Sequence, residues 1–419
     1  MSLANKNILL GVTGGIAAYK SAELVRELVQ AGAQVRVVMT EKAKAFVTPL
    51  TFQALSGHPV ASDEFDAPQA EHGMDHITLA RWADAVLIAP ASANTIAKLT
   101  HGGADDLLST LCLVTRAPIA LAPAMNQAMW SHPATRRNCE ALKKRGILLF
   151  GPGTGKQACG DVGEGRMFEA RQLLLSLDHL FHTNELDGLN VLITAGPTRE
   201  PIDPVRYISN RSSGRMGYAL AEAARDAGAS VELVSGPVAL NAGEGIHCVP
   251  VTTAEEMLEA VHRHVEDQQI FISCAAVSDY RPVAKEPDKI KKLHADLSLA
   301  LTRNPDIVSE VARLPRRPFV VGFAAETREP EKHALQKLER KQLDMIACNN
   351  VADPQCGFDS EENALEVYWP GGHHSLEQDR KPKIARGLIR LIAERYASTH
   401  KPGNVTVLKK IKDRNQNSR

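Results

Sequence analysis

A single cysteine, Cys159, lies in a glycine-rich stretch that could place a thiol over a reaction site. The stretch runs from Gly151 to Met167 and reads GPGTGKQACGDVGEGRM. Glycine loses much backbone entropy on folding, so this composition disfavours a helix or a central strand and predicts a mobile loop. Gly155-Lys156 does not complete a phosphate-binding motif, because the spacing is one residue short and no Ser or Thr follows. Two interpretations stay open: a thiol on a flap, and a flexible connector with an incidental cysteine.

Small polar residues follow the expected strands of the first half, where ligands bind in parallel sheets. Apolar runs that alternate with helical segments such as Ile16–Ala31 predict a doubly wound parallel sheet. Glycine N–H groups at a helix start and nearby hydroxyls suit an anion, so we expect a phosphate-bearing cofactor. Ser92 and Asn94 could equally be helix caps. The expected strands are Ile8–Val12, Val35–Met39, Ala85–Ala89 and Ile119–Ala122, and the hydroxyls are those of Thr13, Thr40, Ser92, Ser109 and Thr110.

Lysines follow expected strands in the second half as well. Lys289–Lys292 comes after the strand Ile270–Ala275, and Asp279 lies between them. Lysines beyond strand ends suit a triphosphate, and a nearby carboxylate suits Mg²⁺. A solvated basic run is the alternative, because neither a Walker motif nor a dinucleotide fingerprint is present. The other expected elements are strands at Asn190–Ala195, Val231–Ser235 and Val320–Phe323, with helices at Ala170–Phe181, up to about Ala227, and from Asn304 onward.

Composition excludes several classes of protein. The 419 residues are 44% hydrophobic and contain 49 Lys+Arg against 49 Asp+Glu, so no global field attracts nucleic acid or an anionic membrane. Length suggests about three domains, and two are also plausible. The seven cysteines form no C-x-x-C pair, which indicates reduced thiols in a cytoplasmic protein. We place the domains at 1–185 and 186–398, with a disordered tail at 399–419.

Six motifs of the first half are similar in order and spacing to the flavin-dependent cysteine decarboxylase family. They are TGGIAAYK, MDHITLARWAD, APASANTIAKL, DDLLST, PAMNQAMW and QACGDVGEGRM. The resemblance implies a flavodoxin-like sheet that binds FMN. It places seven residues around the FMN phosphate and ring: Gly14, Gly15, Thr40, Ser92, Asn94, Ser109 and Thr110.

The same resemblance assigns three catalytic residues to the decarboxylase half. Asn126 would hold the departing carboxylate, His76 would assist oxidation and decarboxylation, and Cys159 would protonate the ene-thiolate. FMN fits this chemistry because it can accept a hydride and later return it, while the protein orients groups and moves protons. On the residues alone, His76 could be a polar residue at a helix start and Asn126 a helix cap.

The second half is similar to the phosphopantothenate–cysteine ligases that are fused to such decarboxylases. The motifs are ITAGPTREPIDPVRYISN, SSGRMG, SCAAVSDYRP, KIKK, NPDIV, VGFAAET and the segment with Lys337 and Lys341. The whole chain therefore resembles the bifunctional decarboxylase/ligase family of coenzyme A synthesis. A Rossmann-like ligase sheet would join 4'-phosphopantothenate to cysteine by using CTP and Mg²⁺.

The resemblance also assigns the ligase residues. Asn210 would bind the acyl-cytidylate, Lys289 would stabilise charge during activation, and Asp279 would act through the base or the metal. Bringing two anions together requires such cationic screening. The residues implied in nucleotide binding are Ser273, Ala275, Asp279, Lys289, Asn304, Pro305, Asp306, Ile307, Phe323, Lys337 and Lys341.

Two other functions stay open on the sequence. One is an FMN-binding regulatory subunit without turnover, against which His76, Asn126 and Cys159 together argue. The other is a nicotinamide oxidoreductase, against which the absence of G-x-G-x-x-G and the presence of KIKK argue. The family resemblance further implies a homo-oligomer whose flavin and ligase sites are built at subunit interfaces. Expected partners are small molecules, with no nucleic acid and no membrane.

Overall fold

The chain folds into two compact units. The computed structural model describes residues 3–62, 75–291, 298–326, 330–350 and 360–400. Contacts divide the chain into residues 1–183 and 184–419, close to the boundary predicted after residue 185. The predicted disorder of the tail falls on 401–419, outside the described residues, whereas Ser398 and Thr399 belong to the last helix.

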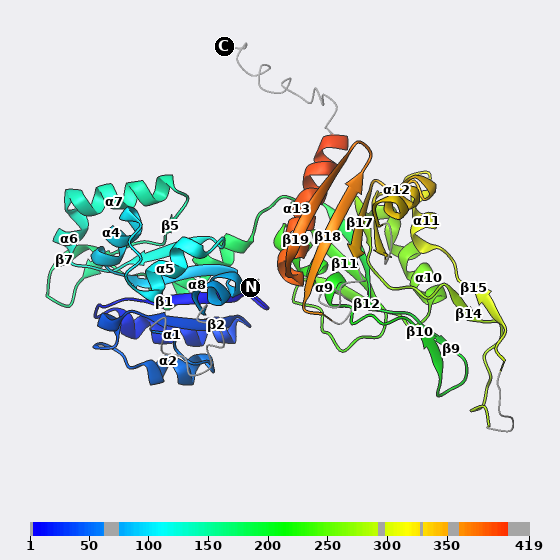
Figure 1. Ribbon diagram of the computed structural model, residues 1–419, viewed down its shortest axis with the longest axis horizontal. Helices are drawn as coiled ribbons and strands as arrows, with labels where there is room; N and C mark the ends of the chain where they lie inside the picture. The colour runs from blue at the N-terminus through cyan, green and yellow to red at the C-terminus, as the bar shows by residue number, and fades with distance from the viewer. Residues whose placement is uncertain (1–2, 63–74, 292–297, 327–329, 351–359, 401–419) are drawn as a thin grey trace, which may run out of the picture. The chain divides into compact units, whose positions relative to one another are not determined.

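The first unit contains a five-stranded parallel sheet in the order β2-β1-β3-β4-β5 (Figure 1). This is the flavodoxin-like order, in which the chain reverses its direction of growth between β1 and β3. The strands are β1 (Asn7–Val12), β2 (Gln34–Met39), β3 (Ala85–Ala91), β4 (Ile119–Pro123) and β5 (Leu148–Leu149). The predicted α/β class and the N-terminal flavodoxin-like sheet are confirmed.

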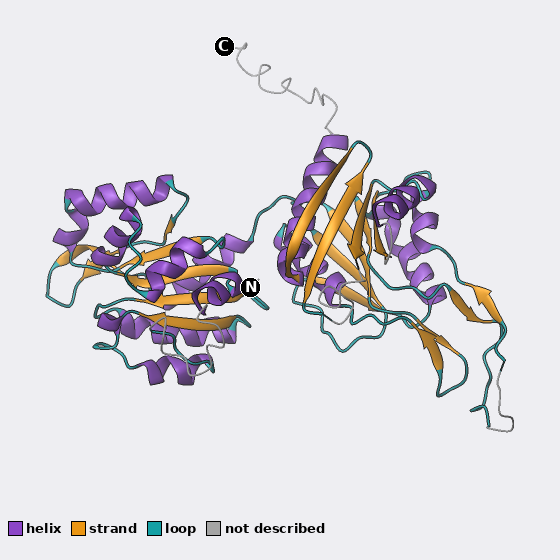
Figure 2. Ribbon diagram, viewed as in Figure 1, coloured by secondary structure: helices purple, strands orange, loops and turns teal. Residues whose placement is uncertain are grey.

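Helices cover both faces of this sheet (Figure 2). Alternation along β1 explains the two cores, because Ile8 and Leu10 join the core beneath α1 and α8 while Leu9 joins the core beneath α4 and α5. The helix predicted at Ile16–Ala31 is shorter, Ala18–Gln30. The helices are α1 (Ala18–Gln30), η1 (Glu41–Ala43), α2 (Pro49–Ser56), α3 (Asp75–Trp82), α4 (Ala93–His101), α5 (Leu107–Val114), α6 (Gln127–Ser131), α7 (Pro133–Lys144) and α8 (Ala170–Phe181).

The glycine-rich stretch, predicted to be a mobile loop, contains a two-stranded β-hairpin, and it forms neither a helix nor a central strand, as predicted. Strands β6 (Gly153–Lys156) and β7 (Val162–Arg166) pair antiparallel, and Cys159 lies in the turn between them. Gly165 has a φ of 134°, which disfavours a side chain, and its carbonyl accepts a 2.9 Å hydrogen bond from the Met125 N–H. The hairpin therefore uses glycine to bring its backbone against the loop after β4.

The second unit contains an eight-stranded sheet in the order β12-β11-β8-β13-β16-β17-β18-β19. Its first six strands are parallel in the Rossmann order, and β18 and β19 add antiparallel. This confirms the Rossmann-like prediction. The strands are β8 (Asn190–Ala195), β11 (Ser230–Ser235), β12 (Ile246–Pro250), β13 (Ile270–Ser273), β16 (Phe319–Glu326), β17 (Met345–Asn350), β18 (Glu362–Trp369) and β19 (Gly372–Arg380).

Two short hairpin pairs lie outside this sheet and project beyond it (Figure 1). They are β9 (Arg199–Pro201) with β10 (Tyr207–Ser209), and β14 (Tyr280–Pro282) with β15 (Leu301–Arg303). The helices are α9 (Arg215–Asp226), α10 (Ala254–His264), η2 (Val265–Asp267), α11 (Ile307–Ala312), α12 (Pro330–Arg340) and α13 (Lys381–Thr399). None of the helices in the described ranges is both long enough and apolar enough to cross a membrane.

Each unit has its own hydrophobic cores, which predicts separate unfolding transitions. Phe52 is fully buried in the first unit and Phe271 in the second. Truncating a buried Phe to Ala costs about 3–5 kcal/mol of unfolding free energy. We expect calorimetry of the full chain to show Phe52→Ala lowering one transition and Phe271→Ala lowering the other. A single transition shifted equally by both variants would contradict two independent cores.

Two candidate active sites

The loops after β1 and β2 meet at the carboxyl edge of the first sheet. A Cβ atom on Gly14 would lie 2.6 Å from Lys42 Cβ, so glycine is required for this approach. Gly15 has no atom within 4 Å of the place where its Cβ would lie. Thr40 begins η1 without forming a side-chain cap. These residues leave open space, and a Thr40 hydroxyl that forms no hydrogen bond with any described residue, at the edge where the chain reverses its direction of growth.

The loop after β3 contributes Ser92 and Asn94. Ser92 caps α4, since its hydroxyl accepts a hydrogen bond from the Thr95 N–H at 3.3 Å. Its own N–H donates to Thr13 Oγ1 at 3.1 Å, which ties the β3 loop to the β1 loop. The cap interpretation of Ser92 is therefore correct in geometry. Asn94 is exposed and its amide forms no hydrogen bond with any described residue.

Ser109 and Thr110 use their hydroxyls inside α5. Ser109 forms a capping box with Asp106 and donates to both Asp106 Oδ1 at 2.8 Å and Asp106 O at 2.9 Å. Thr110 Oγ1 donates to the same carbonyl at 3.0 Å. Both hydroxyls therefore support the helix start, and their predicted contact with a flavin stays a prediction.

Lys98 completes this cap by forming ion pairs with Asp105 at 2.6 Å and Asp106 at 2.7 Å. Burial acts to raise the pKa of Asp106, but the hydrogen bonds from Lys98 and Ser109 outweigh burial and lower this pKa below its ordinary value. Hydrogen bonds to Asp105 and then Asp106 raise the pKa of Lys98. The loop before α5 is thus held by charge at neutral pH.

The edge of the first sheet fits a flavin mononucleotide. The hydroxyl of Thr40 and the amide of Asn94 form no hydrogen bond with any described residue, and Gly15 leaves open space at the same edge of the sheet. They follow β1, β2 and β3, whose carboxyl ends lie side by side. This is the switch point at which flavodoxin-like sheets bind FMN.

Asn126 and Cys159 meet at the tip of the hairpin. Asn126 caps α6, and its Oδ1 accepts a hydrogen bond from the Ala128 N–H at 2.8 Å. Its Nδ2 donates to Cys159 Sγ at 3.3 Å and to Asp161 Oδ2 at 2.9 Å. The structure therefore brings together two of the three predicted decarboxylase residues, 33 positions apart in the sequence.

The hairpin is anchored beside these residues by Glu164 on β7. Its Oε2 accepts hydrogen bonds from Trp130 Nε1 at 2.9 Å and from the Arg136 guanidinium at 3.0 Å. The Trp130 bond and then the Arg136 bond lower the pKa of Glu164. Gln157 adds a hydrogen bond from its side-chain amide to the Met125 carbonyl at 3.3 Å. Side-chain contacts thus hold the turn against the loop after β4.

His76 lies in the first turn of α3 and is partly buried. This matches the simple interpretation of a polar residue at a helix start. Within the described part of the chain, no hydrogen bond joins its ring to Asn126 or Cys159. Its catalytic role stays a prediction.

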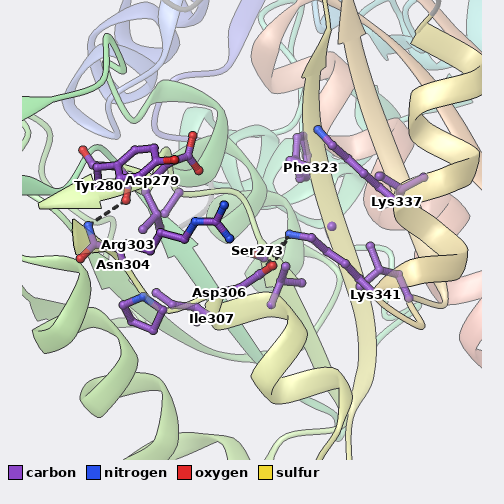
Figure 3. Close-up of a pocket in the computed structure, with 18 residues that line it drawn as sticks. Ser273, Asp279, Tyr280, Arg303, Asn304, Asp306, Ile307, Phe323, Lys337 and Lys341 are labelled. Carbon is purple, nitrogen blue, oxygen red and sulfur yellow. Dashed lines mark hydrogen bonds and ion pairs between the residues drawn. The ribbon is translucent and has the colours of Figure 1, made fainter. Parts of the chain in front are cut away.

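A cavity of about 600 Å³ lies at the carboxyl ends of β13 and β16 in the second unit. Figure 3 shows the Lys337 and Lys341 side chains pointing into the cavity from the wall opposite Asp279 and Tyr280. All of the predicted nucleotide-binding residues except Lys289 line this cavity: Ser273, Ala275, Asp279, Asn304, Pro305, Asp306, Ile307, Phe323, Lys337 and Lys341. The sequence did not single out Arg303 or Tyr280, which line it as well.

One ion pair organises the floor of this cavity. Asp306 caps α11, and its carboxylate contacts Lys341 Nζ at 2.9 Å. Burial acts to raise the pKa of Asp306, but the hydrogen bond and charge of Lys341 lower it overall. The Asn304 amide donates to the Ser278 carbonyl at 2.8 Å and so fixes the opposite wall. The cavity is preformed and carries two lysines.

A second cavity of about 440 Å³ adjoins the first. Asn210 lines it, and the Asn210 amide donates to the carbonyls of Ala276 at 3.2 Å and Val277 at 3.0 Å. Asp279 and Phe323 line both cavities. A reacting carboxylate and a nucleotide could therefore meet at this shared wall.

Lys289 lies on the projecting segment after β14 and lines neither cavity. Its neighbour Ile290 donates its N–H to Asp203 Oδ2 at 3.2 Å. Burial acts to raise the pKa of Asp203, but backbone N–H bonds and Arg206 lower it overall. The predicted Lys289 is thus exposed and tethered away from the cavities of its own chain.

No group of three or more metal-ligating side chains occurs within the described ranges. Asp279 alone stands at the predicted Mg²⁺ position, on the wall that the two cavities share. A magnesium ion held by one carboxylate and by substrate phosphates would fit such a site. The Mg²⁺ prediction stays a prediction.

Comparison with known proteins supports this division. Residues 1–182 match the family described as Flavoprotein, and residues 186–396 match the family described as DNA/pantothenate metabolism flavoprotein C-terminal domain. The coenzyme A biosynthesis bifunctional protein CoaBC of Escherichia coli (strain K12) is 52% identical over 401 residues, which cover 94% of this chain and 98% of that protein. This chain belongs to the coenzyme A biosynthesis bifunctional protein family.

One more full-length relative and two solved structures that each cover about half of the chain are also similar. The protein of that name from Bacillus subtilis (strain 168) is 46% identical over 375 residues, covering 88% of this chain and 92% of the relative. A solved C-terminal domain of coenzyme A biosynthesis bifunctional protein CoaBC has 39% identity and a TM-score of 0.44, covering 50% of this chain and 97% of that chain. The FMN-dependent cysteine decarboxylase SpaF has 35% identity and a TM-score of 0.37, covering 42% and 98%.

Membership of the bifunctional family confirms the family resemblance and the prediction of an enzyme with decarboxylase and ligase halves. It favours this function over a regulatory subunit without turnover. It also confirms that the first unit is a flavoprotein. The sequence missed the hairpin residues Gln157, Asp161 and Glu164; the only signal for Asp161 was its position two residues after Cys159.

The charged cap of α5 predicts a pH-dependent stability. Because the pKa of Asp106 is lowered, its ionised form stabilises the fold above the unfolded pKa of about 3.9 and this contribution is lost as pH falls through the folded pKa. Asp106→Asn should cost about 1 kcal/mol near pH 7. The difference between variant and wild type should stay constant from about pH 5 to 8 and shrink below about pH 4.

Calorimetry of both proteins across this pH range checks the prediction. Asp105→Asn is the matched control, because Asp105 pairs with the same Lys98 but its side chain is 68% exposed against 26% for Asp106. Its effect should be smaller. A difference for Asp106→Asn that persists at pH 3 would contradict the charge-based explanation.

Proposed function

We propose that the second unit joins 4'-phosphopantothenate to cysteine with CTP and that the first unit decarboxylates the product with FMN. The observation that carries the decarboxylase assignment is the 3.3 Å contact between Asn126 Nδ2 and Cys159 Sγ. It places an amide donor at the start of α6 beside a thiol in the turn of the β6–β7 hairpin, both within the flavoprotein unit. The product of the ligase is 4'-phosphopantothenoylcysteine, and decarboxylation gives 4'-phosphopantetheine.

The carboxylate of a cysteinyl group does not leave readily, because the carbanion left behind has no electron sink. Bound FMN would supply one by accepting a hydride from the carbon that carries sulfur and returning it after carbon dioxide has left. Two polar groups without a hydrogen-bond partner among the described residues, the Thr40 hydroxyl and the Asn94 amide, support FMN as the flavin, as does the open space at Gly15. Gly14, Ser92, Ser109 and Thr110 would shape the loops that carry these groups.

Three side chains would act on the substrate. Asn126 would donate its amide to the departing carboxylate, and its cap on α6 already fixes which way the amide points. Cys159 would then give its proton to the ene-thiolate, since a thiol is acidic enough to do so. His76 would assist the earlier steps from the first turn of α3.

In the ligase half, the carboxylate of 4'-phosphopantothenate would attack the α-phosphate of CTP, forming an acyl-cytidylate and releasing pyrophosphate. Lys337 and Lys341 would bind the triphosphate in the 600 Å³ cavity. Asn210 would bind the acyl group in the adjoining cavity, and Asp279 would hold Mg²⁺ between the two. The amine of cysteine would then displace cytidine monophosphate from the acyl carbon.

A homo-oligomer would explain the position of Lys289. This lysine lies on a segment that projects beyond the sheet and is exposed in its own subunit (Figure 1). A second copy of the chain would bring this lysine to a ligase cavity, where it would stabilise charge during activation. We therefore propose that the ligase site is completed between two copies of the chain.

The Cys159→Ser variant tests the decarboxylase assignment. A hydroxyl is a far weaker acid than a thiol, so oxidation and carbon dioxide release should survive while the last protonation fails. In an anaerobic single turnover we expect a flavin that stays bleached and a product two hydrogens short by mass spectrometry. Formation of 4'-phosphopantetheine at the wild-type rate would leave Cys159 an incidental cysteine. Loss of the first oxidation as well would make Cys159 part of site closure.

The Lys289→Gln variant tests the ligase assignment. We expect cysteine ligation to fall at least about a hundredfold, which is typical of losing a charge that stabilises a transition state, while decarboxylation of supplied 4'-phosphopantothenoylcysteine survives. Lys285→Gln, an exposed lysine of the same segment, is the control. Coexpression of Lys289→Gln with Asn210→Asp should restore ligation if two subunits share a site. Hybrids as inactive as either parent would contradict the shared site.

A further inference from the structure

Both donors of the Asn126 amide are used within the chain. Nδ2 carries two hydrogens, and its acceptors are Asp161 Oδ2 at 2.9 Å and Cys159 Sγ at 3.3 Å. The amide cannot turn around without breaking the cap, because Oδ1 accepts the Ala128 N–H. The carboxylate of Asp161 therefore lies where the proposed function requires the carboxylate of the substrate.

Asp161 and Cys159 belong to one tight turn. The Gln157 N–H donates to the Asp161 carbonyl at 2.7 Å, and the Gly160 N–H donates to the Gln157 carbonyl at 2.9 Å. The Gln157 side chain in turn accepts the Gln127 N–H at 3.0 Å. A movement of the Asp161 side chain away from Asn126 therefore loosens the restraint on the thiol two residues before it.

We propose that Asp161 is a positioning residue that occupies the carboxylate-binding donor of Asn126 whenever the substrate carboxylate is absent. This inference rests on the proposed function, in which Asn126 binds that carboxylate. One carboxylate then replaces another on the same N–H, so the exchange conserves a charge-assisted hydrogen bond. A ligand without a carboxylate offers no such replacement.

The exchange also sets the order of events. While the substrate keeps its carboxylate, Asn126 is engaged and Asp161 is displaced. When carbon dioxide leaves, the donor of Asn126 is vacant and Asp161 returns to it. Because the turn moves as a unit, this return brings the Cys159 thiol back to the position from which it protonates the ene-thiolate.

The Asp161→Ala variant separates these effects in the full-length enzyme with FMN bound. Without the internal competitor, KM for 4'-phosphopantothenoylcysteine should fall roughly fivefold, as for one hydrogen bond. In a single turnover, the bleaching of the flavin should keep its wild-type rate, whereas the return of its colour should slow roughly fivefold. Alkylation of Cys159 by iodoacetamide without substrate, followed by mass spectrometry, should be faster than in wild type.

Glu164→Gln is the matched control for a loosened hairpin. It removes a carboxylate that anchors β7 to Trp130 and Arg136 but leaves the contact between Asp161 and Asn126. It should slow the return of colour without lowering KM. Asp161→Asn keeps the shape of the side chain and a neutral acceptor, and should shift KM in the same direction by less. Retained ligase activity and flavin content show that each variant is folded.

The outcomes are distinguishable from failure of the proposed function. Asn126→Ala tests that function alone: wild-type KM and turnover would remove Asn126 as the carboxylate ligand, and the inference with it. If Asn126→Ala is inactive while Asp161→Ala has the KM, colour return and alkylation rate of wild type, only the inference is overturned. A raised KM in Asp161→Ala would make Asp161 a substrate ligand and would also overturn it.

Discussion

The pairing of one parallel strand with neighbours on both sides decides where each site lies. β1 pairs with β2 and β3, and β8 pairs with β11 and β13. Each central strand is thus the point at which the chain changes its direction of growth, and the loops that leave its neighbours diverge there. The space between diverging loops is what admits a ligand. The edge proposed for FMN and the two cavities of the second unit follow from this same constraint.

The first site adds a movable element to that frame. The β6–β7 hairpin lies outside the five-stranded sheet and carries Cys159 in its turn. Its glycines allow the backbone to lie against the loop after β4. Side chains such as Glu164 anchor the hairpin, together with one backbone hydrogen bond from the Met125 N–H to the Gly165 carbonyl, and it does not join the ladder of the five-stranded sheet. Such contacts are easier to exchange than the hydrogen bonds of a central strand.

Local sequence patterns predicted the elements that local physics determines. The helix Ala170–Phe181 and the strand Asn190–Ala195 appear with the predicted bounds, since a continuous apolar face or run marks each of them. Residues in the carboxyl-terminal halves of two strands, such as Ser273 and Phe323, line one cavity because parallel strands end at a common edge. The strand ends were predicted less accurately: β13 ends at Ser273 instead of Ala275, and β16 continues past Phe323 to Glu326.

The sequence could not predict features that depend on distant contacts. A mobile loop was predicted in place of the hairpin because glycine weakens strands, yet contacts with Met125 and Trp130 compensate for that weakness. The role of Asp161 became visible only when it lay 2.9 Å from Asn126, a residue 35 positions away. The location of Lys289 outside the cavities likewise depends on how its segment leaves the sheet, which no local pattern records.

The wall shared by the two ligase cavities has a consequence for inhibitor design. Asp279 and Phe323 contact both spaces, so a nucleotide-like group and an acyl-like group can be joined by a short linker across them. Such a bisubstrate compound loses its translational freedom once rather than twice, and its second half binds at an effective concentration of about millimolar or higher. Under the proposed function, a substitution of either residue that weakens such a compound would also affect the binding of both substrates.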